Sequence, residues 1–123
     1  MVLIIGGAFQ GKREYALGRF GQAEVWNCAP EDTRQPRGAV IVGLEQWLWA
    51  LIQAGEDVEQ TLEQVLPLWA DSAVLCEDIT GGVVPMDKQE RLWREVTGRA
   101  MTRLAGEADE VVRLFCGLPT KLK

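Results

Sequence analysis

The sequence predicts an α/β fold: a three-layer, doubly wound, mostly parallel sheet of about five strands, with helices on both faces. Short runs of apolar, β-branched residues recur along the chain, and segments with the 3.6-residue period of helices separate them. Strands and helices that alternate in this way form parallel sheets. Residues 1–123 are expected to form a single domain, because length and a 47% hydrophobic content suit one compact unit.

The predicted strands are short and strongly apolar. Residues 2–5 form a fully apolar run that ends at Gly6, which is typical of a strand buried on both faces. Similar runs lie at residues 24–27, 39–42, 73–76 and 111–115. Five strands are therefore expected, which is a common sheet size.

The predicted helices carry apolar stripes. Apolar residues recur at helical spacing over residues 44–52, 58–69 and 87–108. Asp87 is expected to cap the last helix, with Glu90 three residues on as its partner.

Two connections differ in character. Residues 28–38 are rich in proline and charge, so we expect an exposed loop. Residues 77–85 leave the C-terminal end of a strand, where open α/β sheets bind their ligands.

Composition excludes several classes of function. A net charge of -5 disfavours binding to nucleic acid, which needs a surplus of lysine and arginine. No apolar run is long enough to span a membrane, so we expect no membrane span and a cytoplasmic location. Cys28, Cys76 and Cys116 are expected to be buried thiols, because their spacing fits neither a disulfide framework nor a zinc site. The chain has no histidine, which excludes histidine nucleophiles and metal ligands.

The first strand runs into a glycine-rich loop. Gly6, Gly11 and Lys12 match the pattern G-x-x-x-x-G-K between a strand and a helix, which is the context of a phosphate-binding loop. The sequence therefore predicts a P-loop NTPase-like domain. The residues expected to contact the nucleotide are Gly6, Gly7, Ala8, Phe9, Gln10, Gly11, Lys12 and Arg13. Lys12 and Arg13 oppose the dipole of the helix that they begin, which also favours a bound anion.

The position after Lys12 departs from the motif. Arg13 stands where a hydroxyl group would hold Mg²⁺, and arginine cannot ligate a cation. A metal ion, if one binds, would have to use Glu45, Glu77, Asp78 or the oxygens of the nucleotide itself. For Glu45, a solvated charge at a helix start is the preferred interpretation.

Several segments together resemble one known family. IIGGAFQGKREYA resembles the start of the bifunctional adenosylcobinamide kinase and adenosylcobinamide-phosphate guanylyltransferase family, whose members begin with a strand and GGARSGKS. Residues 76–123 are similar to the family's C-terminal third, with its ADEV helix-strand junction and a terminal G-L-P-x-x-L-K. AVIVGLEQWLWALI looks like the family's central strand and helix.

The resemblance implies a function and a set of residues. Residues 6–13 would bind the phosphates of GTP or ATP, Lys12 and Asp78 would be catalytic, and Glu77 and Asp78 would lie nearest a metal ion such as Mg²⁺. Gly82, Val84 and Pro85 would shape the neighbouring loop. The family phosphorylates adenosylcobinamide during cobalamin biosynthesis and assembles as trimers, so cobinamide and a homo-oligomer are the implied partners.

The second activity of the family is not expected here. It proceeds through a guanylylated histidine, carried on a segment that residues 28–38 replace in this chain, which contains no histidine.

Three functions remain open from the sequence. The first is a nucleoside-triphosphate-dependent cobinamide kinase. The second is a non-catalytic module that binds a nucleotide or a corrinoid phosphate as a regulatory or partner subunit. The third is a structural or assembly role, for which an exposed tryptophan at Trp47 or Trp49 would provide an anchor.

Overall fold

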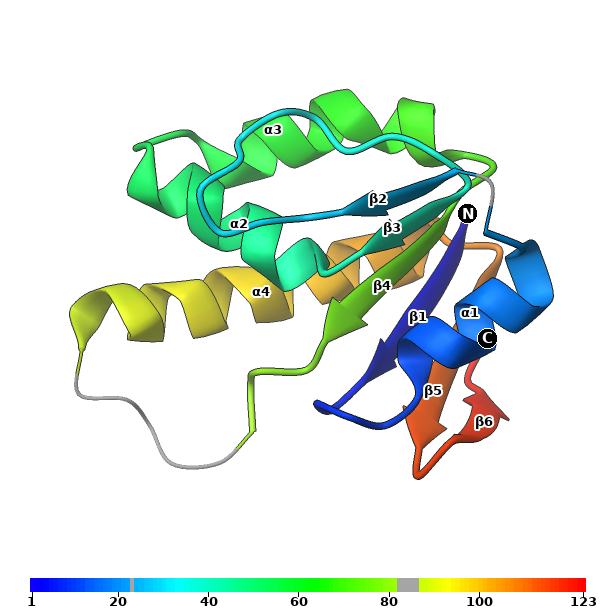
Figure 1. The fold of residues 1–123 in the computed structure, drawn as a ribbon. Coiled ribbons are helices and arrows are strands. Elements are labelled where there is room, and N and C mark those ends of the chain that lie inside the picture. The colour runs from blue at the N-terminus through cyan, green and yellow to red at the C-terminus, as the bar shows by residue number, and fades with distance from the viewer. Residues whose placement is uncertain (23, 82–86) are drawn as a thin grey trace.

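The computed structural model describes residues 1–22, 24–81 and 87–123. Its described strands form a six-stranded sheet in the order β2-β3-β4-β1-β5-β6, parallel except for β6 (Figure 1). The strands are β1 (Val2–Gly6), β2 (Val25–Asn27), β3 (Val40–Val42), β4 (Ala73–Glu77), β5 (Glu110–Phe115) and β6 (Leu118–Lys121).

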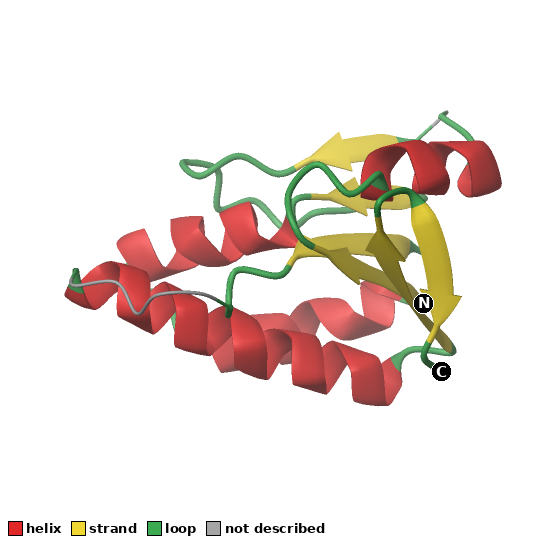
Figure 2. Cartoon of the chain, turned by 90° about the horizontal axis from the view of Figure 1, so that it is seen from below, coloured by secondary structure: helices red, strands yellow, loops and turns green. Residues whose placement is uncertain are grey.

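Helices cover both faces of this sheet, which confirms the predicted three-layer α/β fold (Figures 1 and 2). They are α1 (Lys12–Phe20), α2 (Leu44–Gln53), α3 (Val58–Val65), the 3₁₀ helix η1 (Leu66–Trp69) and α4 (Lys88–Glu107). Helix α1 lies on one face, and α2, α3 and α4 lie on the other.

The core is divided by the sheet into two apolar clusters. Neighbouring residues of a strand point to opposite faces, so Leu3 packs in the cluster under α2, α3 and α4, whereas Ile4 packs in the cluster under α1. Trp47 and Trp69 are fully buried in the larger cluster, with their rings edge to face at 5.8 Å.

Helix boundaries follow local chemistry. The carboxylate of Asp87 accepts hydrogen bonds from the amides of Gln89 and Glu90 at 2.7 and 3.1 Å, so the predicted cap of α4 is confirmed. Helix α3 gives way to η1 at Pro67, because proline lacks the amide that would continue the helix.

The sixth strand was not predicted from the sequence. Cys116 and Gly117 both have positive φ, at 51° and 75°, and form a two-residue turn that folds β6 back antiparallel to β5. Pro119 is tolerated because β6 is an edge strand. Cys116 is exposed at this turn, so the prediction of a buried thiol is wrong there, although Cys76 is buried.

The loop of residues 28–38 is less free than its composition predicts. The indole of Trp69 donates to the carbonyl of Pro36 at 2.8 Å, and that of Trp47 donates to the carbonyl of Thr33 at 3.3 Å. Pro36 itself is buried. Trp49 is half-buried and packs edge to face against Trp93, so α2 does not present the exposed tryptophan expected of an assembly anchor.

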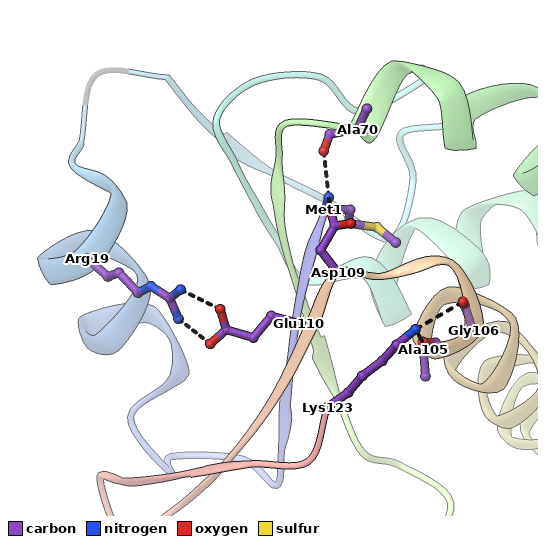
Figure 3. Close-up of polar contacts among 8 residues, drawn as sticks. All are labelled: Met1, Arg19, Ala70, Ala105, Gly106, Asp109, Glu110 and Lys123. Atoms are coloured by element: carbon purple, nitrogen blue, oxygen red, sulfur yellow. Dashed lines mark hydrogen bonds and ion pairs between the residues drawn. The ribbon is translucent and has the colours of Figure 1, made fainter.

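Ionic contacts join segments that are distant in the sequence (Figure 3). The N-terminal ammonium group lies 2.8 Å from the carboxylate of Asp109, and Lys123 donates to the last carbonyls of α4. Arg19 of α1 makes a two-pronged contact with Glu110 of β5, with N···O distances of 2.6 and 2.7 Å. This contact fixes α1 against the edge of the parallel sheet.

Within the described parts of the chain, the helices all fall short of the length and apolar character that a bilayer span demands.

The burial of Trp69 predicts a large effect on stability. Trp69→Ala should lower the free energy of unfolding by about 3–5 kcal/mol, because it leaves a cavity and removes the donor to Pro36. Leu68→Ala is the matched control, since the neighbouring side chain is 56% exposed and its loss should change stability by about 0.5 kcal/mol or less. Urea unfolding measures both values, and equal midpoints for the two variants would contradict this account of the core.

Candidate phosphate-binding site

The glycine-rich loop joins β1 to α1, as predicted, and glycine is required at both of its ends. A Cβ atom on Gly6 would lie 2.6 Å from the carbonyl oxygen of Leu114, so the backbones of β1 and β5 approach more closely than a side chain allows. Gly11 precedes α1 with a φ of 91°, a left-handed conformation that other residues adopt only with strain. Helix α1 therefore begins at Lys12, directly after this left-handed glycine.

In the described chain, most carbonyl groups of the loop have hydrogen-bond donors, whereas most of its amides have no acceptor. The carbonyls of Gly6 and Gly11 accept from the amides of Asp78 and Tyr15 at 2.8 and 3.0 Å. Within the described chain, by contrast, the amides of residues 8–13 donate to no protein group. Unpaired amides at a helix N-terminus, together with the positive end of the helix dipole, attract anions.

The hairpin turn between β5 and β6 braces the loop from one side. The amide of Gly117 donates to the carbonyl of Gln10 at 3.0 Å, and the amide of Cys116 donates to the side-chain oxygen of Gln10. The unforeseen strand β6 thus fixes the conformation of the predicted loop.

The two cations of the loop point in different directions. Lys12 folds back over the loop and donates to the carbonyl of Gly7 at 2.6 Å. Arg13 donates to the side chain of Asn27 at the end of β2. Across the described residues, no carboxylate pairs with either cation, so the expectation of an anion at this position stands.

A cavity of about 260 Å³ lies beside the loop and contains two carboxylates. Lys12, Glu45 and Glu77 line it, together with Phe9, Gln10, Gly11, Arg13, Glu14, Val42, Gly43 and Leu75. Glu45 is only 5% exposed, so its interpretation as a solvated charge is wrong.

Burial governs the ionisation of Glu45. Loss of hydration raises the pKa of its carboxyl group, while the amide of Glu77, which donates to it at 2.8 Å, and the Lys12 ammonium group lower the pKa. Glu45 follows the end of β3 and lies among apolar neighbours, but a single sequence gives no sign that the cavity reaches it.

Asp78 lies on the other side of the end of β4. Its carboxylate accepts from the amide and hydroxyl groups of Thr80 at 3.0 and 2.6 Å, and these bonds, with the charges of Arg113 and Arg94, hold its pKa below the ordinary range. Asp78 borders a larger cavity of about 1090 Å³ between the sheet and α4.

Glu77 and Asp78, the two residues expected to lie nearest a metal ion, therefore do not share a cavity. They line different cavities, because adjacent residues of an extended chain point to opposite faces. In the part of the chain that the structure describes, no three of its acids and cysteines are grouped to hold a metal ion. Gly82, Val84 and Pro85 lie outside the described residues.

Comparison with known proteins identifies relatives of this chain. Residues 21–122 match the model of the family described as cobinamide kinase / cobinamide phosphate guanyltransferase. The chain is also 35% identical over 81 residues to the bifunctional adenosylcobalamin biosynthesis protein CobU of Salmonella typhimurium strain LT2. That alignment covers 64% of this chain and 45% of the relative. The family match begins after the loop, so motif and geometry carry the interpretation of residues 6–13.

The environment of Glu45 predicts a pH-dependent stability. A carboxyl group whose pKa is raised by folding contributes stability at acidic pH, and this contribution is lost as pH rises through the folded pKa. Glu45→Gln mimics the protonated form, so the variant should match the wild type near about pH 4 and become the more stable protein near about pH 8.

Urea unfolding of both proteins across this range measures the difference in stability, in which the effects of titrating groups that do not interact with Glu45 cancel. A difference that does not change with pH would show that burial leaves the ionisation of Glu45 unaffected.

Proposed function

The chain belongs to the cobinamide kinase / cobinamide phosphate guanyltransferase family, and we propose that it binds a nucleoside triphosphate, GTP or ATP, at residues 6–13 and phosphorylates a cobinamide. One observation carries the proposal: the amides of residues 8–13 have no protein acceptor within the described chain, and Lys12 lies among them. The aligned stretch spans less than half of the curated relative, and the loop precedes the family match. The activity is therefore proposed on the unpaired amides and Lys12 of the loop.

The loop residues have distinct parts in this reaction. The amides hold the phosphate oxygens, and Lys12 exchanges its bond to Gly7 for the terminal phosphoryl oxygens, whose charge it stabilises. Arg13 neutralises phosphate charge without ligating a metal ion. The hydroxyl oxygen of the acceptor forms a bond to the terminal phosphorus as the bond to the bridging oxygen breaks, the nucleoside diphosphate leaves, and the hydroxyl proton passes to Asp78 or to water.

The cavity that Asp78 borders is the proposed site of the acceptor. It is an open depression of about 1090 Å³, which has room for part of a corrinoid, and Ile5 and Met101 provide apolar surface. Asp78 borders this cavity and is proposed to orient the acceptor hydroxyl group by accepting its hydrogen bond. Transfer through a loose transition state depends more on such positioning than on a strong base.

The carboxylates beside Lys12 fit a magnesium ion in part. Mg²⁺ binds proteins through one or two carboxylates and takes the remaining ligands from phosphate and water, and Glu45 and Glu77 line the phosphate-side cavity. These residues would hold the ion, which would supply positive charge to the phosphate oxygens. Guanylyl transfer through a histidine is not proposed for this chain, which has none.

A non-catalytic nucleotide-binding subunit is the second candidate. It is favoured by Arg13, which replaces the metal-binding hydroxyl group and is directed to Asn27. The two candidates share the loop and differ in turnover and in their need for a divalent ion.

Lys12→Met tests the proposed function. Wild-type protein at about a hundred times the dissociation constant of GTP or ATP should gain about 2.7 kcal/mol of stability. The variant should bind about 10-fold to 100-fold more weakly, because it loses a charged hydrogen bond to phosphate. Lys88→Met is the control, since it removes the same charge from the exposed start of α4.

Thermal shifts and calorimetry with GTP, ATP, GDP and cobinamide, each with magnesium or chelator, should accompany an assay of phosphate transfer to adenosylcobinamide. Transfer that requires magnesium supports the kinase. Binding without transfer, unaffected by chelator, supports the second candidate. Failure of every nucleotide to bind would contradict both.

A further inference from the structure

A third cavity adjoins the loop, and neither Glu45 nor Glu77 lines it. Its volume is about 670 Å³, and its lining residues are Phe9, Gln10, Gly11, Glu14, Tyr15 and Gly117. Four of them, Phe9, Gln10, Gly11 and Glu14, also line the cavity that holds Lys12 and Glu45. The two cavities therefore adjoin at the loop. A ligand whose anionic groups lie in the cavity beside Lys12 can extend into the neighbouring cavity.

Phe9 stands out at the junction of the two cavities. Its side chain is fully exposed, and its backbone has a φ of 59°, a conformation that bulky residues rarely adopt. In the described chain, the Phe9 ring makes no aromatic or cation–π contact. Both features cost free energy of folding, and no aromatic or cation–π contact among the described residues offsets this cost. A strained, exposed aromatic residue on a binding loop points to a role in contact with a ligand.

The opposite wall of this cavity is held in place. The hydroxyl group of Tyr15 accepts a hydrogen bond from Arg19 at 3.0 Å, and Arg19 is itself fixed by Glu110 (Figure 3). The side-chain oxygen of Gln10 accepts from the Cys116 amide, and the Gly117 turn packs against Gly11. The cavity thus has a fixed floor and a fixed aromatic wall, whereas the Phe9 ring projects into solvent.

We propose that Phe9 stacks on the nucleobase of the nucleotide whose phosphates bind the loop amides, with Tyr15 lining the same base site. The proposal rests on the proposed function, because the loop must first hold the phosphates. Every nucleobase has a flat π-face, and stacking on an aromatic side chain removes both surfaces from water. A purine covers more of the ring than a pyrimidine does, so Phe9 favours purine nucleotides. The phosphates then face Lys12, and the base faces the β5–β6 turn.

The experiment separates the base from the phosphates. Calorimetry should compare GTP, ATP and inorganic tripolyphosphate on wild-type protein, on Phe9→Ala and on Phe9→Tyr, which keeps a ring. Phe9→Ala should weaken GTP and ATP about 5-fold to 100-fold, the range typical of base stacking, and leave tripolyphosphate unchanged. Phe9→Tyr should retain nucleotide affinity. Leu118→Ala is the control, because this residue is 69% exposed and lines neither cavity.

Each other outcome overturns the inference. Equal weakening of nucleotides and tripolyphosphate would mean that Phe9 acts on the shape of the loop. Unchanged affinity of Phe9→Ala for all three ligands would exclude contact with the base. If sedimentation of the same variant then showed a changed oligomeric state, the ring would belong to an interface between copies. If wild-type protein binds none of the three ligands, the phosphate site itself fails, and with it the stacking.

Discussion

The candidate site depends on an imbalance between hydrogen-bond donors and acceptors in the loop between β1 and α1. Four carbonyls between β1 and α1 already have donors: Asp78, Lys12, Gly117 and Tyr15 bond those of residues 6, 7, 10 and 11. The amides of residues 8–13 have no protein acceptor among the described residues. A loop in which most acceptors are paired and the donors are unpaired presents positive potential to solvent, and the helix dipole adds to it. The same bonds fix the backbone, so little order remains to be imposed when an anion binds.

The end of β4 separates two chemical environments. On the side of α1, Glu77 and the buried Glu45 lie in the cavity that Lys12 lines. On the side of α4, Asp78 borders a larger cavity that combines the apolar side chains of Ile5 and Met101 with charged side chains of α4. The alternation of an extended chain produces this separation, and in the proposed function it would put the phosphates and the acceptor on opposite sides of one strand end. In the proposed function, Lys12 and Asp78 therefore act on different reactants.

The layers of the fold and the position of the glycine-rich loop could be predicted from the sequence, because both depend on local sequence patterns. Apolar runs located five strands, and the glycine-lysine pattern located the loop. Strand β6 was missed, since its turn at Cys116 and Gly117 and its proline are unusual features that only an edge position permits. The burial of Glu45 was missed because packing among distant segments decides it. The division of Glu77 from Asp78 follows from strand alternation and could have been predicted.

Nuclear magnetic resonance of the backbone amides, with inorganic pyrophosphate as the titrant, shows directly whether the loop binds an anion. The amide resonances of residues 8–13 should shift together and saturably, because these donors gain phosphate acceptors. The amides of Cys116 and Gly117, which are already bonded to Gln10, should shift less. Loop amides that remain unmoved at saturating pyrophosphate, or shifts spread evenly over the surface, would contradict the claim that this loop is an anion site.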